Sequence, residues 1–189
     1  VEAAAKIKSS DVAELMIGEL EVSRSELVQK IGENVTVRRI AKIEASVVGT
    51  YIHSNEKIGV LIGLEGGDMA LAKEIAMHVA AVNPLVIEPG DVDAEEIEKE
   101  RQIFAAQAEN SGKPAEIIEK MIGGRIRKYL AEISLVEQPF VKDPDQTVGQ
   151  LAKAAGAIVT RMVRFEVGEG IEKDQINFAE EVMAQVRGV

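Results

Sequence analysis

The residues from Lys30 to Gly67 constrain the fold of this chain more than any other stretch. After KIGEN (30–34), the run VTVRRIAKIEASVVGTYIHS alternates its side chains, and EKIGVLIGLEGG follows as a second extended run. Alternation with a period of two places one set of side chains on a buried face and the other in water. We therefore predict an antiparallel hairpin with Asn55 and Glu56 at its turn and His53 beside that turn.

The composition is that of an ordinary soluble globular protein and limits the available chemistry. The 189 residues suffice for one medium domain, or for one domain with an appended module. The net charge of −10 argues against a nucleic-acid surface, because phosphate contacts need clustered Lys and Arg. The absence of cysteine excludes disulfides, thiolate chemistry and cysteine-based zinc sites. Without a membrane-length apolar run or a signal-peptide pattern, we expect a cytoplasmic protein with no membrane partner.

Helical patterns flank the hairpin on both sides. Residues 1–31 indicate helix with a break near residues 9–11, and Gly32 and Asn34 end that region. After the hairpin, Asp68 is the expected N-cap of a helix over residues 69–82, which Asn83-Pro84 stops. The buried stripe expected for that helix consists of Leu71, Ile75, Val79 and Val82.

Residues 86–134 have the character of a projecting helical hairpin. A charged helix over 94–109, a turn at 110–112 and a second helix beginning near Pro114 carry narrow apolar stripes. The basic residues at 125–128 are interleaved with apolar ones and indicate a solvated face. The sequence leaves open whether this hairpin forms a homodimer, packs on a partner, or does both.

The remaining residues return to a globular pattern. Residues 138–140 and 143–145 are expected loops, Thr147 is an expected cap for a helix over 148–155, and 157–167 is a strand able to pair with the earlier hairpin. A last helix is expected at about 175–186. The predicted class is α+β, with small antiparallel sheets packed with helices, a projecting helical hairpin and a C-terminal helix.

No motif in the chain indicates catalysis. The stretch 110–114 superficially resembles a phosphate loop but lacks its upstream glycine, and Pro114 replaces the Ser or Thr that holds magnesium. His78, on an apolar helix, is expected to be a satisfied core or boundary histidine, and the chemistry alone favours a turn role for His53. The paired glutamates have no apolar enclosure that would raise a pKa. We therefore expect a binding protein that is not an enzyme and has no cofactor and no metal.

Several stretches together are similar to one family. KIGENVTVRRI, GTYIHS followed by KIGVLIGLEGG, EIAMHVAA, SGKP, EISLVEQPFVKDPDQTVGQL and RFEVGEGIEK resemble bacterial elongation factor Ts, in unbroken order over essentially the whole chain. The resemblance implies a guanine-nucleotide exchange factor of translation elongation whose partner is elongation factor Tu. It also implies that Ile31 and Gly32 contact the GTPase domain and that His53 contacts the C-terminal β-barrel domain of that partner.

The same resemblance implies a division of the chain. Residues 1–45 would be the end of the N-terminal core subdomain, and 46–85 with 135–169 the C-terminal core subdomain. Residues 86–134 would be the coiled-coil or dimerisation hairpin, and 170–189 the C-terminal module. The family's TDFV motif, whose Asp and Phe wedge near the partner's magnesium and phosphate site, occurs nowhere here. We therefore expect an N-terminally truncated fragment with weakened exchange, and a scaffold that binds the same partner without exchange is the alternative.

Overall fold

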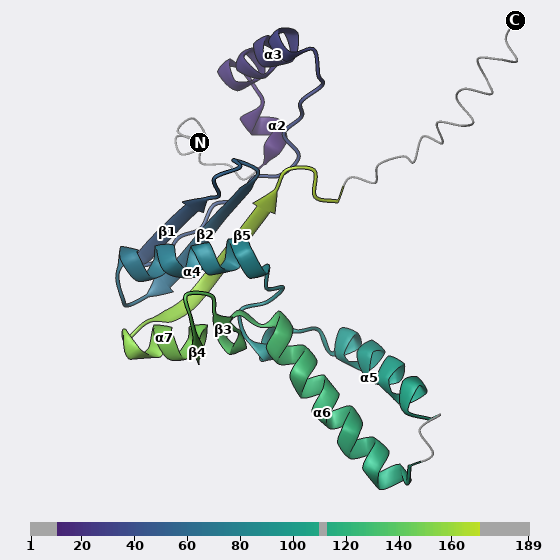
Figure 1. The fold of residues 1–189 in the computed structure, drawn as a ribbon. Helices are drawn as coiled ribbons and strands as arrows, with labels where there is room; N and C mark the ends of the chain where they lie inside the picture. Colours follow the sequence, from purple (N-terminus) through teal and green to yellow (C-terminus); the bar gives the residue numbers. More distant parts are fainter. Residues whose placement is uncertain (1–10, 110–112, 171–189) are drawn as a thin grey trace, which may run out of the picture.

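The computed structural model describes residues 11–109 and 113–170 of the chain (Figure 1). A small antiparallel sheet with one helix across it forms the centre, and a pair of long helices projects from it. The α+β class expected from the sequence is confirmed. The expected helix at 175–186, the turn at 110–112 and the residues before Asp11 lie outside the described residues.

The central sheet has the strand order β1-β2-β5. β1 (Val47–Ile52) and β2 (Ile58–Glu65) form the antiparallel hairpin, with Thr50 opposite Leu61. β5 (Ile158–Glu166) pairs antiparallel with the other side of β2, and the register shifts between Gly63 and Leu64. The predicted hairpin turn and the predicted third strand are both confirmed.

The sequence predicted that the extended, strand-like run begins soon after Asn34, and this prediction was wrong for the residues before β1. Residues 33–46 form no strand in the structure, because no other described segment lies in register to complete a ladder with them. The segment instead crosses the sheet face opposite α4. A Cβ atom built on Gly63 would lie 2.9 Å from the Cβ of Ala45, and the Arg39 guanidinium lies 4.5 Å from the centroid of the Phe165 ring.

Helix α4 (Met69–Val82) covers the other face of the sheet and has the predicted limits. The Asp68 carboxylate accepts a hydrogen bond from the Leu71 amide at 2.8 Å, and Asn83 ends the helix in the left-handed conformation. The expected stripe is buried as far as Val79. Val82 is 44% exposed, because it lies in the last turn, where the chain leaves the sheet.

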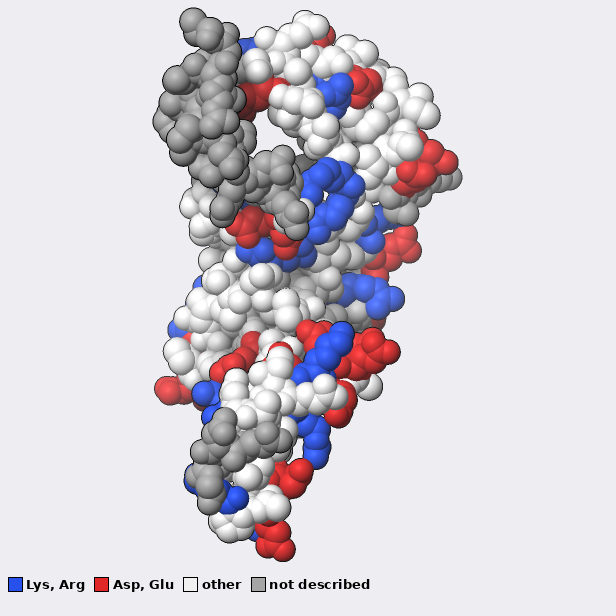
Figure 2. Space-filling view, turned by 90° about the vertical axis from the view of Figure 1, so that its right-hand side faces the viewer, with Lys and Arg blue, Asp and Glu red and all other residues white. Residues whose placement is uncertain are grey.

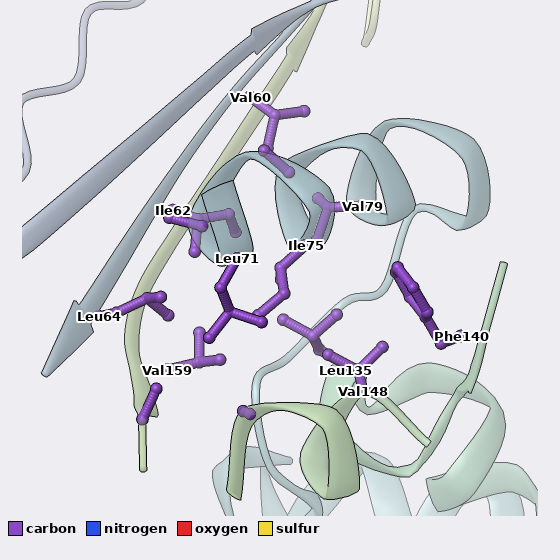
Figure 3. Close-up of a cluster of buried hydrophobic side chains, with 14 of the residues drawn as sticks. Val60, Ile62, Leu64, Leu71, Ile75, Val79, Leu135, Phe140, Val148 and Val159 are labelled. Carbon is purple, nitrogen blue, oxygen red and sulfur yellow. The ribbon is translucent and has the colours of Figure 1, made fainter. Parts of the chain in front are cut away.

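One hydrophobic core joins α4, the sheet and the segment after the helical hairpin (Figure 3). Within residues 11–109 and 113–170, its buried members are Val, Ile, Leu and Ala side chains together with one phenylalanine, Phe140. Burial at roughly 25 cal/mol per Å² of apolar area makes this cluster the main stabilising feature of the domain. The labelled members are Val60, Ile62, Leu64, Leu71, Ile75, Val79, Leu135, Phe140, Val148 and Val159.

The projecting helices are α5 (Ala94–Glu109) and α6 (Ala115–Ile133), which follow the short helix η1 (Pro89–Asp91). They run antiparallel and point away from the sheet (Figure 1). Ile122 is buried between them, and an ion pair joins Arg101 to Glu119 at 2.8 Å. The basic residues at 125, 127 and 128 are exposed, as expected.

The segment after α6 differs from its predicted form. Residues 138–140 and 143–145 were expected to be loops, but β3 (Pro139–Phe140) and β4 (Asp143–Thr147) form a two-stranded antiparallel ribbon after η2 (Leu135–Glu137). Proline lacks an amide donor and is tolerated at strand edges, so its presence did not exclude a short ribbon. The predicted cap at Thr147 is confirmed, since it forms a capping box with Gln150 at the start of α7 (Val148–Ala154).

The first described elements are α2 (Val12–Leu15) and α3 (Glu19–Ile31), which lie beyond one end of the sheet (Figure 1). Asp11 caps α2 by accepting a hydrogen bond from the Ala13 amide at 2.7 Å. An additional break at residues 16–18 separates the two helices, where Gly18 has a φ of 89°. The sequence did not indicate this interruption.

Candidate partner interface at the hairpin end of the sheet

Ile31 and Gly32 form an exposed corner at the end of α3. Ile31 is the last residue of the helix and is 47% exposed. Gly32 follows with a φ of 75°, and its amide donates to the Val28 carbonyl at 2.9 Å. Left-handed backbone of this kind favours glycine, which ends the helix and turns the chain. The corner therefore presents a large apolar side chain on a backbone of fixed shape.

Arg24 fixes this corner to the chain that follows it. Its guanidinium donates to the Val35 carbonyl at 3.0 Å and to Glu21 in the same helix at 2.9 Å. Hydrogen bonding from Arg24 is the main reason that the pKa of Glu21 lies below its usual range. These contacts set the angle at which the chain leaves α3 after Gly32.

A groove of about 570 Å³ lies where the segment 34–39 meets the end of the sheet. Its walls come from residues 34–39, from Ile52 at the end of β1, from 56–59 at the start of β2 and from 165–168 at the end of β5. The Lys57 carbonyl accepts a hydrogen bond from the Val167 amide at 2.8 Å and holds the last two walls together. The chain just after Gly32 and the tip of the hairpin therefore lie at one end of the molecule.

Two arginines hold the segment 34–39, which forms one wall of that groove, in place. Arg39 pairs with the Glu169 carboxylate at 2.6 Å, and Arg38 donates to the Glu169 carbonyl at 2.6 Å. The hydrogen bond from Arg39 lowers the pKa of Glu169 below its usual range. A guanidinium stacked over an aromatic ring adds a cation–π contact, which Arg39 makes with Phe165.

His53 lies at the hairpin tip, on the face of the sheet opposite to the groove. Side chains alternate along β1, so Ile52 faces the groove while Tyr51 and His53 face the α4 side. The Tyr51 hydroxyl lies 3.2 Å from Nδ1 of His53. The backbone of His53 is fixed as well, since its amide donates to the Ile58 carbonyl at 2.9 Å and its carbonyl accepts from the Glu56 amide at 2.8 Å.

Comparison with known proteins identifies the family. The family described as elongation factor Ts matches residues 1–169 of the chain. This chain belongs to the elongation factor Ts family. Among the relatives is elongation factor Ts of Hahella chejuensis, which is 60% identical over 181 residues, covering 96% of this chain and 63% of the relative. Elongation factor Ts of Marinobacter nauticus is 62% identical over 175 residues, covering 93% and 61%.

The match is of similar extent in a third member of the family. Elongation factor Ts of Cellvibrio japonicus is 58% identical over 186 residues, which cover 98% of this chain and 64% of the relative. The chain therefore spans about three fifths of the length of the curated relatives that it matches. The family assignment rests on nearly all of this chain and on only part of each relative.

His78 has the structural role expected of it from the sequence. It is fully buried, and its Nε2 lies 2.9 Å from Oε1 of Gln138 while its Nδ1 accepts the Val141 amide at 3.2 Å. Burial lowers its pKa, although the contact with Gln138 acts in the opposite direction. Because Gln138 also donates to the Glu132 carbonyl at 2.6 Å, the cluster connects α4 to the end of α6.

Side chains of both charge signs lie on the surface of the molecule (Figure 2). Figure 2 shows Lys and Arg interspersed with Asp and Glu on the face that it presents. Within residues 11–109 and 113–170, no group of His, Asp or Glu side chains has the arrangement needed to hold a metal ion. No helix in the same ranges is long and apolar enough to cross a membrane.

The sequence analysis did not identify the residues that hold the expected contact residues and the neighbouring segment in place. Tyr51 was detectable, because it precedes His53 by two positions and strand side chains at that spacing share a face. Arg39 and Glu169 are 130 positions apart, and no local pattern connects them. Ile31, Gly32 and His53 are not lining residues of the groove, and His53 lies on the opposite face of the sheet from it.

Proposed function

We propose that this chain binds elongation factor Tu and takes part in guanine-nucleotide exchange on it. The family match over residues 1–169 carries the proposal. The exposed corner at Ile31 and Gly32 and the fixed hairpin tip at His53 support it, because they carry the three residues that the family resemblance associates with the partner.

Exchange of this kind needs no acid, base or nucleophile. The factor and the nucleotide weaken each other's binding to the GTPase by the same coupling free energy, so binding of the factor accelerates nucleotide release and excess GTP later displaces the factor. A coupling of about 1–3 kcal/mol changes an affinity roughly 5- to 150-fold. A rigid surface that binds differently to two states of the partner is sufficient for this mechanism.

These 189 residues contain no TDFV sequence, the motif that the family resemblance places near the partner's magnesium and phosphate site. We propose that the chain binds elongation factor Tu measurably and stimulates GDP release weakly. The test is release of a fluorescent GDP from elongation factor Tu, measured with increasing concentrations of the chain, beside a direct binding measurement by calorimetry. Full stimulation of release would contradict the weak-exchange proposal, and absence of binding would contradict the proposed partner.

A second candidate function is a scaffold that binds elongation factor Tu without exchange. The projecting hairpin favours it, because α5 and α6 leave Ile103 and Ile117 exposed at 47% and 46%. A complex with elongation factor Tu that persists in excess GTP would support the scaffold, and its displacement by GTP would support exchange. Homodimerisation through α5 and α6 is a separate proposal, which sedimentation of the chain at increasing concentration tests.

A further inference from the structure

The side chain of His53 is held from the core by a residue to which the family resemblance gives no role. Tyr51 belongs to β1 and packs against the hydrophobic core, while its hydroxyl reaches Nδ1 of His53 at 3.2 Å. The two rings are tilted by 58° with centroids 6.1 Å apart, so the contact between them is made through the hydroxyl and not by stacking. The core thus constrains the ring orientation at the hairpin tip.

The opposite edge of the His53 ring is available to another molecule. Among the residues that the structure describes, no hydrogen-bond partner is present for Nε2 of His53, and that atom is not among the buried side-chain atoms lacking a partner. It is therefore accessible to solvent. A neutral imidazole carries one N–H donor and one acceptor nitrogen, and the group bonded to one nitrogen decides which role the other has.

We propose that Tyr51 is the positioning residue for His53: its hydroxyl donates to Nδ1 and keeps the proton on Nε2, where it is offered to an acceptor oxygen of the partner. The inference rests on the proposed function, in which His53 contacts elongation factor Tu. The hydrogen bond fixes both the tautomer and the side-chain torsions before binding, so less freedom is lost when the complex forms.

The first test is the tautomer of His53 in the free chain, observed by long-range proton–nitrogen NMR of the imidazole rings above neutral pH. The chain has only two histidines, and His78 is held separately by Gln138 and Val141, so it serves as an internal reference. In Tyr51→Phe, the Nδ1 and Nε2 shifts of His53 should move towards each other as the tautomers mix, while those of His78 stay unchanged. Unchanged His53 shifts would overturn the proposal.

The second test is the affinity of the full 189-residue chain for elongation factor Tu. Loss of one orienting hydrogen bond in Tyr51→Phe should weaken binding by about two- to tenfold. Tyr129→Phe is the matched control, because Tyr129 is the only other tyrosine and its hydroxyl bonds Glu96 on the projecting helices. Phenylalanine retains the ring that packs in the core, and a denaturant titration confirms that each variant folds.

A double-mutant cycle separates positioning from a general structural effect. Tyr51→Phe should weaken binding when His53 is present and have no further effect when His53 is replaced by Ala. An equal loss in both backgrounds would overturn the positioning role. If His53→Ala binds as well as the unaltered chain, or the unaltered chain does not bind, the proposed contact fails and this inference fails with it. A different result would overturn only the positioning role: His53→Ala weakens binding to elongation factor Tu, but Tyr51→Phe leaves the affinity unchanged.

Discussion

Gly49 in β1 lies directly against Ala72 in α4, so closely that a Cβ atom on Gly49 would stand 2.5 Å from the Cβ of Ala72. The backbone carbonyl carbon of Ala72 would be equally close. The helix can therefore approach the sheet at this point only because β1 has no side chain there. This contact allows α4 to cover one face of the sheet. The side chains of Val60, Ile62 and Leu64 project from that face and are buried.

We predict that Gly49→Ala destabilises the fold by about 1–3 kcal/mol, because the added methyl group forces α4 away from β1. Gly59→Ala is the matched control, since Gly59 lies in the same sheet and a Cβ there meets nothing within 4 Å. That control should change the free energy of unfolding by less than about 0.5 kcal/mol. Urea titration followed by circular dichroism measures both. Equal effects of the two substitutions would show that the contact with Ala72 is unimportant.

The buried His78 predicts a pH dependence of stability. Burial lowers its pKa in the folded state below the ordinary value, so the unfolded chain binds the proton first as the pH falls. A charged imidazole would also lose the acceptor at Nδ1 that the Val141 amide uses. Stability should therefore be full above about pH 6.5 and fall as the pH drops below that value.

The measurement is the free energy of unfolding between pH 7.5 and 5.5, above the range in which most carboxylates titrate. His53→Gln is the control that assigns the effect, because it removes the only other histidine. The fall in stability should persist in that variant. If it disappears, the pH dependence originates at the hairpin tip and not at His78.

Elements with local signals were the ones that the sequence predicted well. The limits of α4 followed from a capping carboxylate at Asp68 and from Asn83-Pro84, which act within one turn of the helix ends. The hairpin was predicted from the alternation of side chains. The end of α3 was predicted from Gly32, which follows the last helical residue. These signals depend on the immediate neighbours of each residue, so a single sequence was sufficient.

Elements that depend on distant partners were predicted poorly. The residues from Ala41 to Ala45 alternate in burial like a strand, but a ladder also needs a second chain segment in register, which alternation does not reveal. The same limitation concealed the contacts of Arg39 with Phe165 and Glu169. The expected partner contacts of Ile31, Gly32 and His53 came from family resemblance and remain predictions.

Gly32 gives a prediction that depends on backbone conformation alone. A Cβ at Gly32 would meet nothing within 4 Å, yet its φ of 75° is unfavourable for other residues. We predict that Gly32→Ala costs about 1–2 kcal/mol and that Gly32→Asn costs less, because Asn tolerates left-handed backbone. Gly90→Ala, at an equally open position without positive φ, should be neutral. Thermal or urea unfolding checks the order, and a harmless Gly32→Ala would contradict the assigned strain.

Ile31 gives the sharpest test of the proposed interface. Because it is 47% exposed in the free chain, Ile31→Glu should leave the free energy of unfolding within about 0.5 kcal/mol of its original value. If the side chain is buried against elongation factor Tu, the loss of its apolar burial should weaken the complex by about ten- to a hundredfold.

Val141→Glu is the matched control for Ile31→Glu, since Val141 is 46% exposed in the turn between β3 and β4 and the substitution makes the same change in charge. Calorimetric titration of elongation factor Tu with each variant measures the difference. Equal weakening by both substitutions would indicate a general effect of charge, and no weakening by Ile31→Glu would remove this corner from the interface.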